Sequence, residues 1–252
     1  LDDGTKLLLW VGDMGTKSDV NKTSLCYSIY NGSTWSEPKV TSDTGGLNDY
    51  PYIVSDGKTV SILWQKTDSA MPDSAGLEEI LKFMTYQNGT FSKAVKITEN
   101  SSSYEMFHSL AVCKNQIGAA WIENSANDPF LLEGTNVIKK AVRKNGKWTV
   151  STIAEGLSQI DNCAAVNWND EPGVLYECED QIYIVTDSET ITLQGKNAQV
   201  ENNLLYYESG EVLMVYDISS KQSRETGLPA FGTTYTVTIL DNNPVISAVS
   251  YT

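Results

Sequence analysis

Five acidic residues recur at the same place in a repeated pattern, and they are the chain's strongest candidates for chemistry. Each precedes an apolar stretch, and four of them are followed by an aromatic residue 15 or 16 positions later. Carboxylates that converge on one opening repel one another, which raises their pKa values or attracts a cation. An oxygen-rich ring suits Ca²⁺, Mg²⁺ or the ammonium group of a ligand. The five residues are Asp49, Glu105, Asp161, Glu201 and Asp241.

The same carboxylates have an architectural explanation. An acidic side chain ahead of a strand can accept hydrogen bonds from backbone N–H groups of the preceding loop. A residue that recurs in every repeat fits architecture better than catalysis, because catalysis needs groups with distinct roles. We therefore predict no catalytic residue and treat these carboxylates as candidates for ligand binding or loop structure.

Aromatic residues end the second predicted strand of each repeat, which follows a tight turn such as Ser209-Gly210 in the last repeat. They are Trp10, Trp64, Trp121, Tyr176 and Tyr216. Aromatic faces stack on sugar rings, so the three tryptophans are candidate ligand-binding residues beside the carboxylates. The alternative is packing between neighbouring sheets, where each large ring buries roughly 150–250 Å².

The remaining reactive residues exclude several classes of protein. The formal net charge of −14 argues against binding to nucleic acid. One histidine, His108, cannot build a multi-histidine zinc site. No apolar run approaches the roughly 20 residues that span a bilayer. Cys163 and Cys178 flank a turn and are either a cross-hairpin disulfide or two buried thiols.

Tight turns and alternating strands must position these residues. Asn-Gly pairs between alternating stretches predict hairpins, because a type I′ turn needs positive φ at both central residues. These pairs are Asn31-Gly32, Asn88-Gly89 and Asn145-Gly146. Helical periodicity is absent. Each repeat therefore reads as four antiparallel strands, which is the blade of a β-propeller.

The repeat count predicts one all-β domain, a closed five-bladed β-propeller over residues 1–252. The chain begins with a turn into a second strand, and it ends with a single strand over 243–249. We expect this last strand to become the innermost strand of the first blade, which would close the ring. The approximate blades are 1–46 plus 242–252, 47–100, 101–156, 157–197 and 198–241.

One turn carries a family resemblance. The stretch 28–35, Ser-Ile-Tyr-Asn-Gly-Ser-Thr-Trp, resembles the Asp-box of sialidase-like propellers, with Tyr30 where the aspartate stands. The resemblance implies the propeller fold, and the chain as a whole looks like degenerate propeller repeats of exported bacterial proteins. Sialidases of that type hold the substrate carboxylate with three arginines, but this chain has only Arg143 and Arg224. Sialidase activity is therefore excluded.

Three functions fit the pattern. The first is a non-catalytic, monomeric module of a larger secreted or cell-surface protein, which binds a glycan or a protein on its acidic, loop-rich face. The second is a glycoside hydrolase that uses Asp49, Glu105 and Asp161, since such enzymes act through a pair of carboxylates. The third is a structural spacer. The low basic content and the abundance of Asn, Ser, Thr and Tyr favour an extracellular location.

Overall fold

The fold is all-β and antiparallel. The computed structural model describes residues 1–13, 23–42, 46–67, 79–98, 105–126, 128, 130–131, 133–232, 235–240 and 243–248. No helix occurs among these residues, and hence none that could cross a membrane. Asn88-Gly89 and Asn145-Gly146 have positive φ at both residues, which confirms the predicted hairpin turns. At the third pair only Gly32 has positive φ, and Asn31 Oδ1 instead accepts hydrogen bonds from the N–H groups of Ser33 and Thr34.

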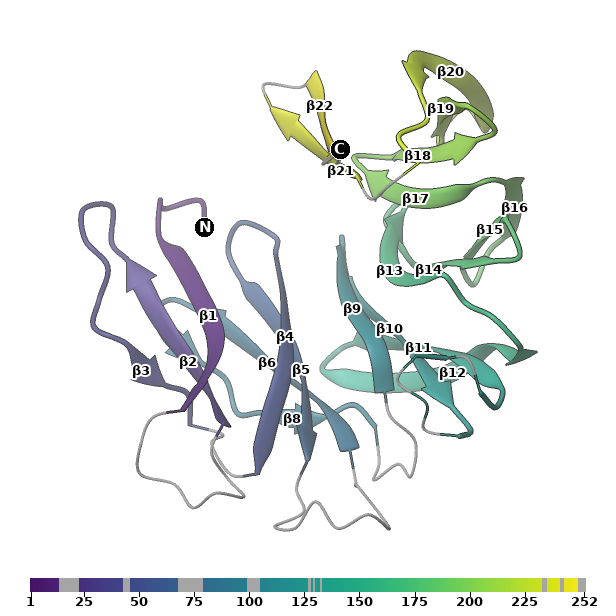
Figure 1. The fold of residues 1–252 in the computed structure, drawn as a ribbon. Coiled ribbons are helices and arrows are strands. Elements are labelled where there is room, and N and C mark those ends of the chain that lie inside the picture. Colours follow the sequence, from purple (N-terminus) through teal and green to yellow (C-terminus); the bar gives the residue numbers. More distant parts are fainter. Residues whose placement is uncertain are drawn as a thin grey trace.

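The strands form six sheets arranged in an arc (Figure 1). The first sheet holds β1 (Lys6–Asp13), β2 (Thr23–Tyr30) and β3 (Lys39–Val40). The second holds β4 (Leu47–Ser55), β5 (Val60–Thr67), β6 (Glu79–Gln87), β7 (Thr90–Phe91) and β8 (Val95–Lys96). The third holds β9 (Glu105–Cys113), β10 (Gln116–Asn124), β11 (Asn136–Lys144) and β12 (Lys147–Leu157).

The later sheets follow the same plan with shorter strands. The fourth holds β13 (Asn162–Trp168), β14 (Glu171–Cys178), β15 (Gln181–Val185) and β16 (Thr190–Gln194). The fifth holds β17 (Lys196–Glu201), β18 (Leu204–Ser209), β19 (Val212–Asp217) and β20 (Gln222–Pro229). The sixth is a hairpin of β21 (Tyr235–Leu240) and β22 (Asn243–Ala248).

The hydrophobic core is divided into five clusters, each lying between two neighbouring sheets. Successive side chains of a strand point to opposite faces of its sheet. A sheet therefore contributes apolar side chains to one cluster on each face. Trp64 lies between the first and second sheets, and Trp121 lies between the second and third; both side chains are fully buried. The clusters that follow join the third sheet to the fourth, the fourth to the fifth, and the fifth to the sixth.

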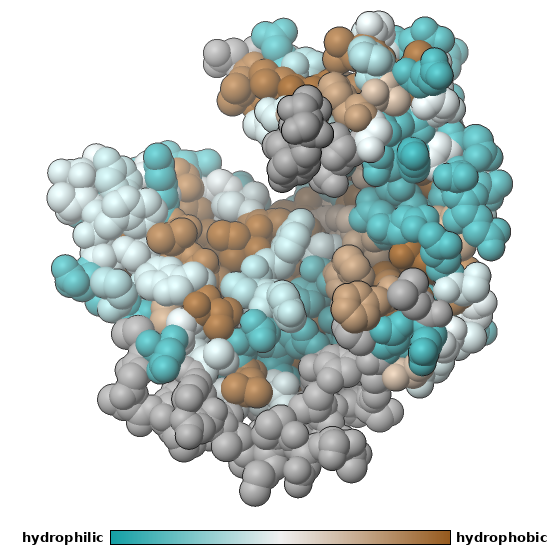
Figure 2. All heavy atoms as spheres, viewed as in Figure 1, coloured by the Kyte–Doolittle hydropathy of each residue, from teal (hydrophilic) through white to brown (hydrophobic). Residues whose placement is uncertain are grey.

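The predicted closure of the ring is wrong for the described residues. β22 pairs with β21, from Leu240 opposite Asn243 to Tyr235 opposite Ala248, and not with β1. The two-residue connection explains this, because such a short link favours a local hairpin over a long-range pairing. Figure 2 shows an open notch between the sixth sheet and the first. The described strands therefore form an open arc of six sheets rather than a closed ring of five.

The fifth sheet also departs from the predicted strand assignment. Ser209-Gly210 connects β18 to β19, so Tyr216 lies on the third strand of its sheet and Tyr207 holds the second-strand aromatic position. The repeat is compressed here because Gly195 alone separates β16 from β17. Gly195 has φ 155°, and a Cβ atom at this position would lie 2.4 Å from the carbonyl oxygen of Glu208. Only glycine fits this connection.

Candidate functional site

The innermost strands β4, β9, β13, β17 and β21 border a central channel with two adjoining hollows. The first hollow, of about 790 Å³, lies where these strands begin, and its polar lining comes from Gln159, Asp161, Asn162, Glu177, Asp180, Lys196, Asn197, Gln199 and Tyr235. The second, of about 600 Å³, lies toward their ends, beside Ser55, Asn167 and Glu201. Tyr52 and Val166 line both. We call the end with the first hollow the channel mouth.

Three of the innermost strands carry a β-bulge at the channel mouth. In each, two residues oppose a single aromatic residue of the second strand: Tyr50-Pro51 against Trp64, Phe107-His108 against Trp121, and Asn197-Ala198 against Tyr207. The first residue of every bulge has positive φ, at 45°, 53° and 56° respectively. Two aromatic residues of the repeat noticed in the sequence, Trp64 and Trp121, therefore mark the partner positions of bulges. Bulges redirect side chains and are frequent beside functional sites.

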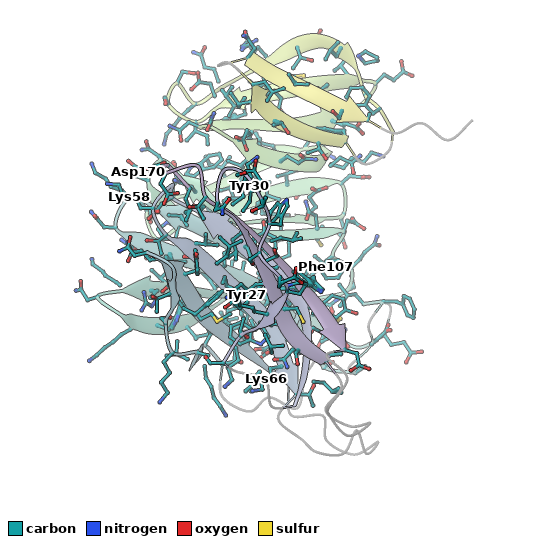
Figure 3. All side chains as sticks on the ribbon, turned by 90° about the vertical axis from the view of Figure 1, so that its left-hand side faces the viewer. Tyr27, Tyr30, Lys58, Lys66, Phe107 and Asp170 are labelled. Carbon is teal, nitrogen blue, oxygen red and sulfur yellow. The ribbon has the colours of Figure 1, made fainter. Side chains whose placement is uncertain are left out.

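The bulges in β4 and β9 expose two aromatic rings. Tyr50 is 70% exposed and Phe107 is 55% exposed. Bulky residues rarely adopt positive φ, which costs about 1–3 kcal/mol and is typical of functional sites. Figure 3 shows Phe107 on the opposite side of the arc from Lys58 and Asp170, which lie in the turns that follow β4 and β13. Phe107 therefore lies on the side of the channel mouth, opposite the turns that hold Lys58 and Asp170. Tyr50 lies at the same end, because it stands in the first half of β4 as Phe107 does in β9.

His108 connects the two aromatic bulges. Its Nε2 lies 2.6 Å from the carbonyl oxygen of Tyr50, and its Nδ1 lies 3.4 Å from the carbonyl oxygen of Glu105. Both partners are carbonyl oxygens, which only accept hydrogen bonds. We therefore assign the ring proton to Nε2, which has the shorter contact and donates a hydrogen bond to the Tyr50 carbonyl oxygen. The imidazole is buried, which lowers its pKa, although the two hydrogen bonds oppose that shift. His108 is thus a structural link between β4 and β9.

A network around two buried glutamates organises the first hollow. Glu177 accepts hydrogen bonds from Asn162 Nδ2 at 2.9 Å and from the N–H groups of Asn197 and Ala198 at 2.7 and 2.8 Å. Glu208 accepts one from Asn197 Nδ2 at 2.9 Å. Glu208 also accepts hydrogen bonds from the N–H groups of Phe231 and Gly232, which precede β21. The sequence predicts acidic side chains that accept backbone N–H groups where innermost strands begin. Glu177 and Glu208 do this, but each belongs to the second strand of the preceding sheet.

These two glutamates were missed at the sequence level although a signal existed. Each directly follows the second-strand aromatic, in Tyr176-Glu177 and Tyr207-Glu208. Each is also buried, at 3% and 1% exposure. A buried carboxylate is stable only when hydrogen-bonded, so a repeated aromatic-Glu pair inside an apolar strand indicates such a role.

The five predicted carboxylates do not meet at one opening. Asp161 lines the first hollow, and Asp49 is exposed next to Tyr50 on β4. Glu105 is fully buried in β9. Glu201 is the last residue of β17 and lines the second hollow, so its predicted place ahead of an innermost strand is wrong. Asp241 lies outside the described residues.

The three predicted tryptophans have little surface to offer a ligand. Trp64 and Trp121 are 0% exposed, and their indole N–H groups donate to Asn48 Oδ1 and Glu123 Oε1. Trp10 is half-buried in β1, where it pairs with Cys26. The accessible aromatic surface at the channel mouth comes instead from Tyr50, Tyr52 and Phe107, which follow the recurring carboxylates Asp49 and Glu105 and were not singled out in the sequence.

The cysteines form no disulfide, and no cluster of three metal-binding side chains occurs, in the described part of the chain. All four cysteines are free and buried. Cys163 pairs with Tyr176 across the strands rather than with Cys178, and burial raises the pKa of the Cys163 thiol to about 12. No group of three His, Cys, Asp or Glu side chains within the described ranges could hold a metal ion.

Known structures share this fold. No protein-family model and no curated protein sequence matches the chain. The structure is similar to the α-L-arabinanase of Penicillium chrysogenum, with a TM-score of 0.51 and 9% identity over 87% of this chain and 73% of that one. It is similar to the sialidase of Trypanosoma rangeli, with a TM-score of 0.55 and 10% identity over 97% of this chain but only 50% of that one. It is also similar to an α-L-arabinofuranosidase variant of Fusarium graminearum, with a TM-score of 0.50 and 11% identity over 88% of this chain and 70% of that one.

These neighbours are propeller enzymes, and identity this low establishes the fold alone. The chain spans half the length of the sialidase that it matches. It therefore has a β-propeller fold made of four-stranded antiparallel blades, of which the described residues form an arc.

Proposed function

We propose that this chain is a non-catalytic, extracellular propeller module that binds a glycan at the channel mouth. The observation that carries the proposal is the pair of exposed aromatic rings, Tyr50 and Phe107, held at positive φ on adjacent innermost strands. Aromatic faces bind the apolar faces of sugar rings, and strained residues at one opening are typical of binding sites.

The polar lining of the first hollow supports the same proposal. Asn162, Asn197 and Gln199 supply amide groups, and Asp161 supplies an exposed carboxylate. Amides and carboxylates together donate and accept hydrogen bonds, which matches the hydroxyl groups of a sugar. The solved neighbours with arabinobiose or a sialidase inhibitor are consistent with a carbohydrate ligand.

The arrangement of the carboxylates favours binding over hydrolysis. A glycosidase needs one carboxyl group as acid and a second as base or nucleophile on either side of the scissile bond. Glu177 accepts three hydrogen bonds from the protein on its two oxygens, and Glu105 is fully buried. Of the predicted carboxylates that the structure describes, Asp161 alone is exposed in the first hollow; Asp180, which was not singled out in the sequence, is a second exposed carboxylate in its lining.

A glycoside hydrolase remains the second candidate function, because Asp161 and Glu177 line the same hollow. A glycan array followed by a hydrolysis assay on the bound glycans separates the two. We expect binding without release of reducing ends. Hydrolysis that Asp161→Asn abolishes would replace the binding proposal with the enzymatic one, and an array without any bound glycan would contradict both.

A further inference from the structure

A polar groove lies between the second and third sheets, on the face opposite the channel mouth. Its volume is about 330 Å³, and it shares only Val112 with the second hollow and no residue with the first. Lys58 stands in the β4–β5 turn that borders it, and Figure 3 shows Lys58 on the other side of the arc from Phe107. We call it the Arg143 groove, because Arg143 near the end of β11 lines it.

Aromatic rings hold Arg143 in place. Its guanidinium carbon lies 5.1 Å from the centre of the Phe83 ring on β6, and its cross-strand partner on β12 is Trp148. Trp148 in turn packs edge-on against Phe83, with 5.1 Å between the ring centres. An aromatic face stabilises a cation without using its N–H groups. The guanidinium group is therefore oriented while its donors stay free for another partner.

The nitrogen atoms of Arg143 have no partners in the described part of the chain. Nε is buried without a hydrogen bond, and the two terminal nitrogens form neither a hydrogen bond nor an ion pair there. The side chain is half-buried, and its terminal nitrogens, unlike Nε, keep accessible surface at the groove. A charge that is partly withdrawn from water without an opposite charge is unfavourable. The unused donors therefore point to an anionic ligand.

The second sheet shows that the fold does not need an arginine at this place. Tyr86 on β6 pairs with Phe91 across the strands as Arg143 pairs with Trp148, and the two members of each pair are five residues apart. Tyr86 is 2% exposed and belongs to the hydrophobic core. An aromatic side chain thus satisfies the packing at the corresponding position. Packing alone does not explain the arginine, whereas ligand binding does.

The rest of the lining favours one kind of anion. Neutral amide and hydroxyl groups both donate and accept hydrogen bonds, which matches the hydroxyl groups of a sugar. Asp56 in the lining and the net charge of −14 disfavour a ligand with several negative charges. The volume is at the small end of the roughly 300–1,000 Å³ of ligand pockets, which suits one sugar residue. The neutral polar side chains are Thr59, Ser61, Thr85, Gln87, Asn115, Gln116 and Asn145.

From this juxtaposition we propose that the Arg143 groove is a second ligand site, which binds a sugar residue that carries a single carboxylate, a uronate. The terminal nitrogens of Arg143 donate to the carboxylate, because a guanidinium group forms two parallel hydrogen bonds with that planar group. The amides and hydroxyl groups around it bind the sugar hydroxyls. This site goes beyond the proposed function, since it shares no residue with the first hollow at the channel mouth.

The test is an NMR titration of the intact chain, in which the backbone amide signals of Asn115 and Gly146 report on the groove. Four probes are compared: methyl glucuronide, methyl glucoside, acetate, and acetyl-glycyl-glycine with a free C-terminal carboxylate. We expect the glucuronide to bind about tenfold or more tightly than each of the other three, because it alone combines the bidentate carboxylate pair with the sugar hydroxyls.

Variants of the two arginines locate the effect. Arg143→Gln should lower the affinity for the glucuronide about tenfold or more, and Arg143→Lys should restore little of it, because an ammonium group is a point charge without the planar fork. Both variants should stay folded, since Arg143 has no hydrogen bond or ion pair to lose in the described part of the chain. Arg224→Gln is the matched control, because it makes the same charge change at an exposed position on β20, and it should leave the affinity unchanged.

The outcomes separate this site from the channel mouth. Equal affinity for the glucuronide and the glucoside, or an equal effect of Arg224→Gln, would overturn the role of Arg143. Equally tight binding of acetate or of the dipeptide would overturn the uronate as the ligand. Glucuronide shifts confined to Asn162 and Asn197, which line the first hollow, would place the sugar at the channel mouth and overturn the second site. Failure of glycan binding at the channel mouth alone would contradict the proposed function and leave this site standing.

Discussion

The Nε2 atom of His108 on β9 lies 2.6 Å from the carbonyl oxygen of Tyr50 on β4. This single hydrogen bond joins two bulges in different sheets, and each bulge begins with an exposed aromatic residue at positive φ. The aromatic pair at the channel mouth is therefore held by a buried imidazole, and the geometry of the site depends on how the imidazole is protonated.

The first prediction concerns pH. Burial lowers the pKa of His108 in the folded chain, so the unfolded chain binds more protons once the pH falls below about 6.5. Stability is then full above that pH and is lost as the pH falls toward the lower, folded pKa. Urea unfolding of the wild type between pH 7.5 and 5.5 should show this loss.

His108 is the only histidine, so its removal gives a clean comparison. In His108→Gln the stability should be lower at pH 7.5 but nearly constant down to pH 5.5. An equal loss of stability with pH in both proteins would show that other groups cause it.

The second prediction concerns backbone strain. Phe107→Gly removes the cost of a bulky residue at positive φ, so the free energy of unfolding should rise by about 1 kcal/mol, less the small loss of contacts of a half-exposed ring. Glycan affinity should fall about tenfold, since an aromatic pair contributes about 1 kcal/mol or more beyond burial. Phe130→Gly is the control, because Phe130 is 77% exposed without positive φ. It should bring no gain in stability, and a destabilised Phe107→Gly would contradict the assignment of strain.

The third prediction concerns the glutamate network. Glu177→Ala leaves the N–H groups of Asn197 and Ala198 unpaired, which should lower the free energy of unfolding in urea by about 2–6 kcal/mol, because each buried unpaired donor costs roughly 1–3 kcal/mol. Glu179→Ala, two residues away and exposed, should change stability by less than about 0.5 kcal/mol. Similar values for both variants would mean that Glu177 does not organise the start of β17.

The fourth prediction concerns the shortest connection between sheets. Gly195→Ala places a Cβ atom 2.4 Å from the carbonyl oxygen of Glu208, so the fifth sheet must shift or separate. We expect a fall in melting temperature well beyond that of Gly210→Ala. Gly210 also has positive φ but has open space around it, so alanine there should cost only about 1 kcal/mol. Equal effects of the two substitutions would contradict the close approach.

The repeat was predictable because its signals are local. Asn88-Gly89 and Asn145-Gly146 form tight turns because both residues of each pair readily adopt positive φ. Trp64 and Trp121 precede these turns by the same number of residues along the sequence. The fifth sheet was misassigned because Gly195 replaces a whole loop, so Ser209-Gly210 resembles the turn of an earlier repeat. The bulges were not predictable, because positive φ at Tyr50 and Phe107 results from pairing with strands that follow later in the chain. The proposed ligand surface therefore lies one or two residues away from the predicted acidic residues.

The most direct test of glycan binding at the channel mouth is calorimetric titration of the double variant Tyr50→Ala, Phe107→Ala with whichever glycan binds the wild type. We expect the double variant to stay folded, because alanine keeps the same backbone conformation and only exposed rings are removed, and to lose at least about 30-fold in affinity, since two stacking contacts of about 1 kcal/mol or more are removed. Wild-type affinity in a folded double variant would contradict the account.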